Sequence, residues 1–127
     1  MTIHPYTSVD EFPFGATREV LHRAGPPVRE YLNTRGDLEL DYGDMVYRFQ
    51  QGRFIEATFP LPEVIWIGKQ RVDGRSLVAW LRDRDRSYRE RHGFAVAPSF
   101  GIAVDLDDDD PKHWTTAFAP GRWPDVS

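Results

Sequence analysis

The sequence contains no cysteine and has only two lysines among its 16 basic residues. Without cysteine the chain has no disulfide bonds, no thiol nucleophile and no zinc site with thiolate ligands. No segment approaches the roughly 20 consecutive apolar residues that cross a membrane as a helix. The N-terminal stretch MTIHPYTSVDEF also lacks the basic and apolar regions of a secretion signal, so we expect a cytoplasmic protein.

The chain also lacks an excess of positive charge. Its 20 acidic residues outnumber the 16 basic ones, and its net charge is -4. A general nucleic-acid binder neutralises phosphates with a basic excess, so this class of function is disfavoured. A length of 127 residues with 40% hydrophobic residues is enough for one core. We therefore expect a single globular domain spanning residues 1–127.

The first half of the sequence predicts a short helix followed by antiparallel strands. Thr17 is a candidate N-cap, and Gly25 followed by two prolines ends the helix after about two turns. Between residues 29 and 72, alternating apolar and polar residues separated by glycine turns predict a strand meander with one solvated face. The continuous apolar run 64–67 predicts a strand that is buried on both faces or at its centre.

The second half predicts another helix and two or three further strands. Residues 75–91 follow a helical pattern with Ser76 as a candidate N-cap, and the part beyond Leu81 is rich in charge. Residues 94–104 and 113–118 have the composition of strands. The sequence therefore predicts an α+β fold of about six or seven antiparallel strands, with two helices on one face of the sheet. This order also suggests two helix-plus-hairpin units.

The opening of this pattern resembles a known repeat. Residues 15–20 (Gly-Ala-Thr-Arg-Glu-Val), the later Gly25-x-Pro27 and the strands at 38–42 and 45–49 resemble the repeat of β-lactamase inhibitory protein and of small outer-membrane lipoproteins. The same features are similar to several bacterial immunity proteins that neutralise polymorphic or contact-delivered toxins. The sequence lacks the lipoproteins' acylated cysteine and the inhibitors' disulfides. The resemblance, which covers the first half of the chain, therefore implies a cytoplasmic immunity protein.

The densest local feature is the acidic run 105–110, which has five carboxylates in six positions. A calcium loop of the EF-hand type starting at Asp105 needs glycine at its sixth position and glutamate at its twelfth, where this chain has Asp110 and Thr116. The run is therefore a solvated turn, a partner-binding patch or an unrecognised metal site. Two tryptophans flank it, and tryptophan is typical of binding hot spots. The predicted partner-binding residues are Asp107, Asp108, Asp109, Asp110, Trp114 and Trp123.

No pattern in the sequence predicts catalysis. The four histidines have no recognised metal-ligand spacing, no serine lies in a Gly-x-Ser-x-Gly turn, and no glycine loop ends in Gly-Lys-Ser/Thr. We accordingly expect neither catalytic residues nor a cofactor or metal.

The leading hypothesis is a protein-binding inhibitor that occludes the active site of a cognate bacterial toxin. Its acidic loop would meet a cationic surface of the toxin, because complementary charge accelerates encounter and favours the correct partner. An alternative is an enzyme or small-ligand-binding protein with a pocket between helix and sheet, for which Tyr47, His92 and Asp105 are candidates. A structural or assembly subunit is the third possibility.

Overall fold

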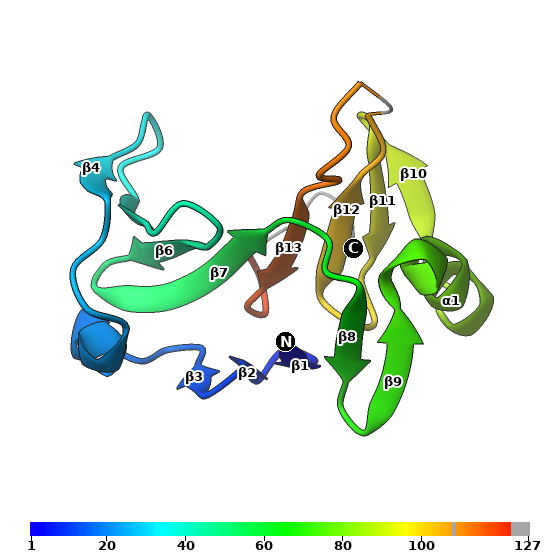
Figure 1. Cartoon of the computed structure of the whole chain (residues 1–127), viewed down its shortest axis with the longest axis horizontal. Helices are drawn as coiled ribbons and strands as arrows, with labels where there is room; N and C mark the ends of the chain where they lie inside the picture. Colours follow the sequence, from blue (N-terminus) through cyan, green and yellow to red (C-terminus); the bar gives the residue numbers. More distant parts are fainter. Residues whose placement is uncertain (108, 123–127) are drawn as a thin grey trace.

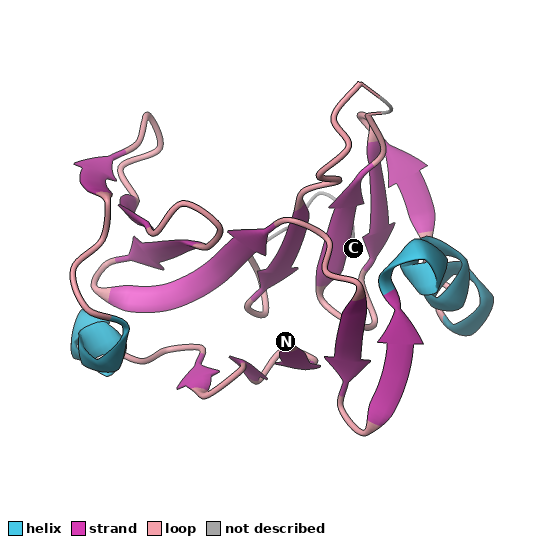
Figure 2. Cartoon of the chain, viewed as in Figure 1, coloured by secondary structure: helices cyan, strands magenta, loops and turns pink. Residues whose placement is uncertain are grey.

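The computed structural model describes residues 1–107 and 109–122. Within these ranges the strands form two sheets, one of five strands and one of eight, and two helical regions accompany them. Strands dominate the molecule (Figures 1 and 2). The predicted α+β fold is confirmed in this coarse form, whereas the prediction of about six or seven strands is wrong. No described helix is long and apolar enough to cross a membrane.

The larger sheet is antiparallel throughout and curves upward at both ends in Figure 1. Its order is β10-β11-β12-β13-β7-β6-β5-β4, so the last strands of the two halves of the chain meet at its centre. There Thr58 lies opposite Thr116, and their hydroxyl oxygens are 2.9 Å apart. The strands are β4 (Arg29–Leu32), β5 (Leu38–Asp41), β6 (Val46–Gln50), β7 (Arg53–Phe59), β10 (Arg89–Arg91), β11 (Phe94–Ala97), β12 (Ile102–Asp105) and β13 (Thr115–Phe118).

The smaller sheet lies below the larger one in Figure 1 and includes three strands that the sequence does not predict. Its order is β3-β2-β1-β8-β9, with β1 parallel to β8. The first three strands have only two or three residues each, too few for an alternating pattern to stand out. The strands are β1 (Thr2–His4), β2 (Ser8–Val9), β3 (Phe12–Pro13), β8 (Val64–Ile67) and β9 (Gln70–Asp73).

The hydrophobic core fills the space between the sheets. Phe49 and Phe54 from the larger sheet are fully buried with ring centroids 5.7 Å apart, and Ile3 and Ile65 enter from the smaller sheet. Successive residues of a strand point to opposite faces, so each sheet needs only one apolar face to build this core. The prediction that 64–67 is buried on both faces is accordingly wrong, because Trp66 points outward and is 41% exposed.

The first helical region is confirmed in position but is a 3-10 helix, η1 (Arg18–Ala24). Thr17 is its N-cap residue, although its side chain makes no capping hydrogen bond. Gly25 ends the helix with a positive φ of 75°, which glycine adopts without strain. Only Leu21 of this segment is buried, so little packing supports a longer α-helix.

The second helical region is shorter than predicted. A 3-10 turn, η2 (Gly74–Ser76), leads into α1 (Leu77–Arg84), and residues 89–91, predicted as helix, form strand β10 instead. The buried carboxylate of Asp85 ends the helix, because it accepts hydrogen bonds from the Ser87 amide and from the amide and hydroxyl of Ser99. These bonds tie the end of α1 to the β11–β12 turn.

The prediction that the two helices cover one face of the sheet is wrong. They lie at opposite ends of the molecule in Figures 1 and 2, and the smaller sheet covers the apolar face of the larger one. The sequence prediction missed this arrangement because it did not include strands β1 to β3. As a result, the other face of the larger sheet has no covering layer of strands or helices among the described residues.

We expect Ile65→Asp to unfold the protein. Ile65 is fully buried, and an unpaired carboxylate in the core costs several kcal/mol against a total stability of roughly 5–15 kcal/mol. The control is Trp66→Asp at the neighbouring, outward-facing position, which should change the urea unfolding midpoint much less. Equal midpoints for the two variants would contradict the assigned faces of β8.

Candidate functional site

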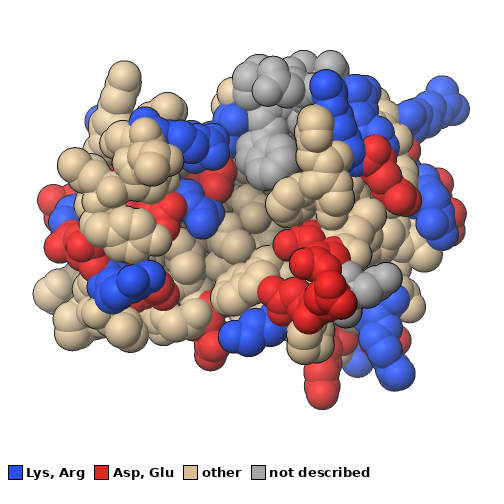
Figure 3. Space-filling model, turned by 90° about the horizontal axis from the view of Figure 1, so that it is seen from above, with Lys and Arg blue, Asp and Glu red and all other residues tan. Residues whose placement is uncertain are grey.

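The outer face of the larger sheet is hollow; it is polar over the strands of the first half and partly apolar over β11 to β13, where Val96, Ala103 and Phe118 are buried. Strand alternation directs Tyr47 and Phe49 of β6 into the core and Val46 and Arg48 to the outer face. Figure 3 shows this side of the molecule from above, with charged side chains of both signs around a central hollow. The hollow has a volume of about 610 Å³ and takes residues from both halves of the chain. Its lining includes Arg35, Glu39 and Arg48 from the first half and Phe94, Asp105 and Trp114 from the second.

Arg48 of β6 organises the first-half wall of the hollow. Its Nε donates to Glu39 Oε1 at 2.9 Å, and its Nη1 donates to Glu56 Oε2 at 2.9 Å and to Thr58 Oγ1 at 2.6 Å. These partners come from β5 and β7, the two strands that flank β6. Arg48 therefore joins three adjacent strands through their outward-facing side chains.

Arg122 joins the chain's last described residues to the same cluster. Its Nε donates to Glu56 Oε1 and its Nη2 to Asp37 Oδ2, both at 2.7 Å. The Arg122 side chain is 5% exposed and that of Asp37 only 2%. Glu56 thus lies between the two arginines. A buried guanidinium needs such bonds, because burial without paired charges is very unfavourable.

We call the three carboxylates and two guanidinium groups of Asp37, Glu39, Arg48, Glu56 and Arg122 the buried charge network. The pKa of Glu39 lies below its ordinary value. Its burial acts to raise this pKa, but hydrogen bonds from Tyr31, Asn33 and Arg48 outweigh the burial. The same bond to Glu39 raises the pKa of the Tyr31 phenol. Glu39 is therefore ionised, and Tyr31 protonated, at neutral pH.

The buried charge network is suited to holding a surface rigid. Every buried side-chain polar atom of the described residues has a hydrogen-bond partner. The described residues also contain no cluster of three histidine or acidic side chains placed to hold a metal ion. What the network presents is a fixed pattern of charge beside aromatic side chains, an arrangement that favours recognition.

The acidic run begins at Asp105, which lines the hollow. Three of its carboxylates stabilise the loop itself. Oδ1 of Asp105, Asp107 and Asp110 accepts a hydrogen bond from the backbone amide two residues later, at 2.9, 2.9 and 3.0 Å. Asp107 and Asp109 are exposed. These contacts agree with a solvated turn, and the exposed carboxylates are also accessible to a partner.

The predicted partner-binding residues are separated by the structure. Trp114 lines the hollow, with the Lys112 ammonium 5.2 Å from its ring centroid, whereas the described aspartates 107, 109 and 110 are not among the lining residues. Asp108 and Trp123 lie outside the described residues. The loop therefore supplies charge at the edge of the hollow, and Trp114 supplies apolar area inside it.

The residues nominated for the enzyme hypothesis do not form one site. Tyr47 lies in the core on the other face of the sheet, and its burial raises the pKa of its phenol to about 12. His92 is exposed in the turn before Gly93, and Asp105 alone lines the hollow. The structure gives no contact among the three.

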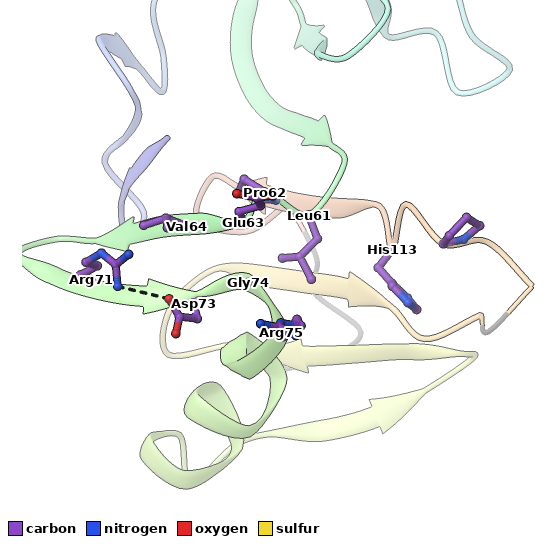
Figure 4. Close-up of a pocket in the computed structure, with 10 residues that line it drawn as sticks. Leu61, Pro62, Glu63, Val64, Arg71, Asp73, Gly74, Arg75 and His113 are labelled. Atoms are coloured by element: carbon purple, nitrogen blue, oxygen red, sulfur yellow. Dashed lines mark hydrogen bonds and ion pairs between the residues drawn. The ribbon is translucent and has the colours of Figure 1, made fainter.

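A second pocket, of about 560 Å³, lies between the segment before β8 and the start of α1 (Figure 4). Pro62 packs closely against Gly74 in its lining. A Cβ atom added at Gly74 would lie 1.9 Å from the Pro62 carbonyl oxygen. Figure 4 shows Arg71 paired with Asp73, while Arg75 and His113 lie apart on other sides. Because its charged groups do not converge, we place the candidate site on the outer face of the larger sheet.

In comparisons with protein-family models, with characterised proteins and with solved structures, no match to this chain is found. The geometry of the outer face therefore carries the proposed function.

We expect Arg122→Met to destabilise the protein by about 3–5 kcal/mol, because it leaves the carboxylate of Asp37 buried without its ion pair. Urea unfolding measures this loss. Arg75→Met, at an exposed arginine, is the matched control and should fall within about 0.5 kcal/mol of the wild type. A loss below about 1 kcal/mol for Arg122→Met would show that the buried charge network does not hold the C-terminal segment.

We also expect the effect of Glu39→Gln to depend on pH. Because the pKa of Glu39 is lower in the folded than in the unfolded chain, its ionised form stabilises the fold above its ordinary pKa. That stabilisation is lost as pH falls through the lowered pKa. The stability difference between wild type and Glu39→Gln should therefore be large at about pH 7 and shrink towards about pH 3. Glu63→Gln, at an exposed position, should show little difference at either pH. A stability difference between wild type and Glu39→Gln that does not change with pH would contradict the lowered pKa of Glu39.

Proposed function

We propose that this protein is a protein-binding inhibitor whose hollow outer face receives a cationic segment of a partner protein. In this proposal the partner is a cognate bacterial toxin, and binding occludes its active site, as expected of an immunity protein. The observation that carries the proposal is the open hollow of about 610 Å³, lined by paired charges and aromatic side chains from both halves of the chain.

Charge supports a cationic partner. The lining of the hollow has three carboxylates, of Glu39, Glu56 and Asp105, against the two guanidinium groups of Arg35 and Arg48, which leaves one negative charge in excess. The exposed Asp107 and Asp109 add two carboxylates beside it. Such a surface accelerates encounter with a positively charged segment and disfavours acidic competitors.

Aromatic side chains provide the apolar part of the contact. Phe94 and Trp114 both line the hollow, close to Asp105. The ammonium of Lys112 already lies 5.2 Å from the Trp114 ring centroid, which shows that the ring accepts a cation at its face. To bind at this face in the same way, a lysine or arginine of the partner must displace the Lys112 ammonium.

Preorganisation supports recognition of a folded surface. The side chains of Arg48, Glu39 and Glu56 are held by several hydrogen bonds each, so a partner does not have to order them. Rigid groups lose little conformational entropy on binding, and this favours affinity.

Small-ligand binding is the alternative, because the hollow's volume lies in the range of ligand pockets. The enzyme version of this alternative has less support, since Tyr47 and His92 lie away from the hollow. The two proposals differ in the ligand of the hollow: an inhibitor binds a toxin and neutralises it directly, whereas the alternative binds a small molecule.

We expect the C-terminal domain of the protein encoded immediately upstream to bind this chain, and Trp114→Ala to raise the dissociation constant by about tenfold or more. Removing the ring deletes apolar contact in the centre of the hollow. Trp66→Ala is the matched control, because Trp66 is exposed on the outer face of the smaller sheet. Isothermal titration measures the dissociation constant of each variant, and a growth-rescue assay measures how well each variant neutralises the toxin.

The salt dependence of association tests the partner's charge. Association of the wild-type protein should slow as salt rises, because steering is screened beyond a Debye length of about 8 Å at physiological ionic strength. Absence of binding, or equal effects of the two tryptophan variants, would overturn the proposed function.

A further inference from the structure

The two edges of the larger sheet are protected very differently. Strand β10 at one edge has three residues, and all of them are charged. Strand β4 at the other edge exposes Tyr31 by 40% and Leu32 by 71%, and Val28 just before it is 75% exposed. Short, charged edges prevent further strand pairing, whereas exposed apolar edges permit it. The β4 edge is therefore the one open to another strand.

The backbone of β4 offers hydrogen-bonding groups at this edge. The Asn33 amide points inward and donates to the Asp37 carbonyl of the β4–β5 turn at 2.9 Å. Amide directions alternate along a strand, so within β4 the Tyr31 amide also points to β5 while those of Glu30 and Leu32 point outward. The alternation ends before β4 begins, because the Val28 amide also donates to β5, to the Asp41 carbonyl at 2.7 Å. Strand β4 ends the strand order, so no described strand meets these outward groups. A further β-strand is the partner that satisfies them.

We infer that a second copy of this chain pairs with β4 in antiparallel orientation. In such pairing, residues whose backbone groups point outward must lie opposite each other. When Glu30 lies opposite the partner's Leu32, Leu32 also lies opposite the partner's Glu30. These two residue pairs form four backbone hydrogen bonds. The two-fold axis then passes between Tyr31 and the partner's Tyr31. Two aromatic rings facing each other in this position stabilise a strand pair.

Charge disfavours a register centred on Glu30, and the turn that follows Leu32 disfavours one centred on Leu32, because that register would need pairing beyond the end of β4. With the axis at Tyr31, Arg29 lies opposite the partner's Asn33, so no like charges face each other. The alternative register with its axis at Glu30 places two carboxylates directly opposite, which is destabilising. A self-complementary strand of this kind gives a closed dimer with one shared interface.

The dimer extends the larger sheet across the two-fold axis. Figure 1 shows β4 at one end of the molecule, far from α1, so the second copy continues the sheet without meeting α1; η1 lies at the β4 end, where Arg18 pairs with Glu30. A two-fold axis perpendicular to a sheet keeps both outer faces on the same side. The dimer therefore presents two hollows side by side, whatever their ligand is.

Cross-linking tests the register directly, because the wild-type chain has no cysteine. Tyr31→Cys places two thiols across the axis at a Cα separation of about 4.5 Å, within the range that a disulfide spans. Leu32→Cys is the matched control. Its residue is more exposed, yet the two copies of it are diagonal neighbours about 7–8 Å apart, too far for a disulfide.

With diamide as the oxidant, we expect Tyr31→Cys to form covalent dimers about tenfold faster than Leu32→Cys, and sedimentation equilibrium of the wild type to show dimers. Tyr31→Lys, which places two ammonium groups across the axis, should raise the dimer dissociation constant about tenfold. Because this substitution also removes the hydrogen bond from Tyr31 to Glu39, its control is Tyr31→Phe, which loses the same bond but keeps the ring and should still dimerise. Equal cross-linking of the two cysteine variants, a monomeric wild type at high concentration, or dimers that persist in Tyr31→Lys would each overturn the inference.

Discussion

The outer face of the larger sheet depends on Glu56, whose carboxylate is shared by two arginines. One oxygen accepts from Arg48 and the other from Arg122, so this side chain connects the sheet to the C-terminal segment. Removing either arginine leaves Glu56 with less compensation for its burial. The rigid pattern of charge around the hollow is therefore a property of the whole network and not of any single pair.

The two faces of the larger sheet differ in what covers them. Its inner face packs aromatic and aliphatic side chains against the smaller sheet, and this burial provides most of the stability. Its outer face has no covering layer of described strands or helices, so polar side chains can occupy it if they satisfy one another. The core therefore lies on one side of the sheet and the proposed binding surface on the other, although the buried charge network on that second side also contributes to stability.

Much of the fold could be predicted from local sequence signals, whereas the candidate site could not. The glycine turns and alternating residues between 38 and 59 give three strands of the larger sheet, and Gly25 ends the first helix as expected. The end of α1 was missed because it depends on Asp85 reaching Ser99, a tertiary contact. The buried charge network was missed for the same reason, since Arg122 is 85 positions from Asp37. The acidic run stood out by composition, but its carboxylates largely stabilise their own turn.

The seam between β7 and β13 has a kinetic consequence. Thr58 and Thr116, which meet there, are 58 positions apart, so the chain must close a long loop before the two halves pair. Contacts of this separation slow folding, because loop-closure entropy is lost before the contacts form. The hollow spans this seam and exists only once it has closed. A ligand in the hollow therefore binds only the fully assembled sheet and, by mass action, lowers the population of chains in which the halves have separated.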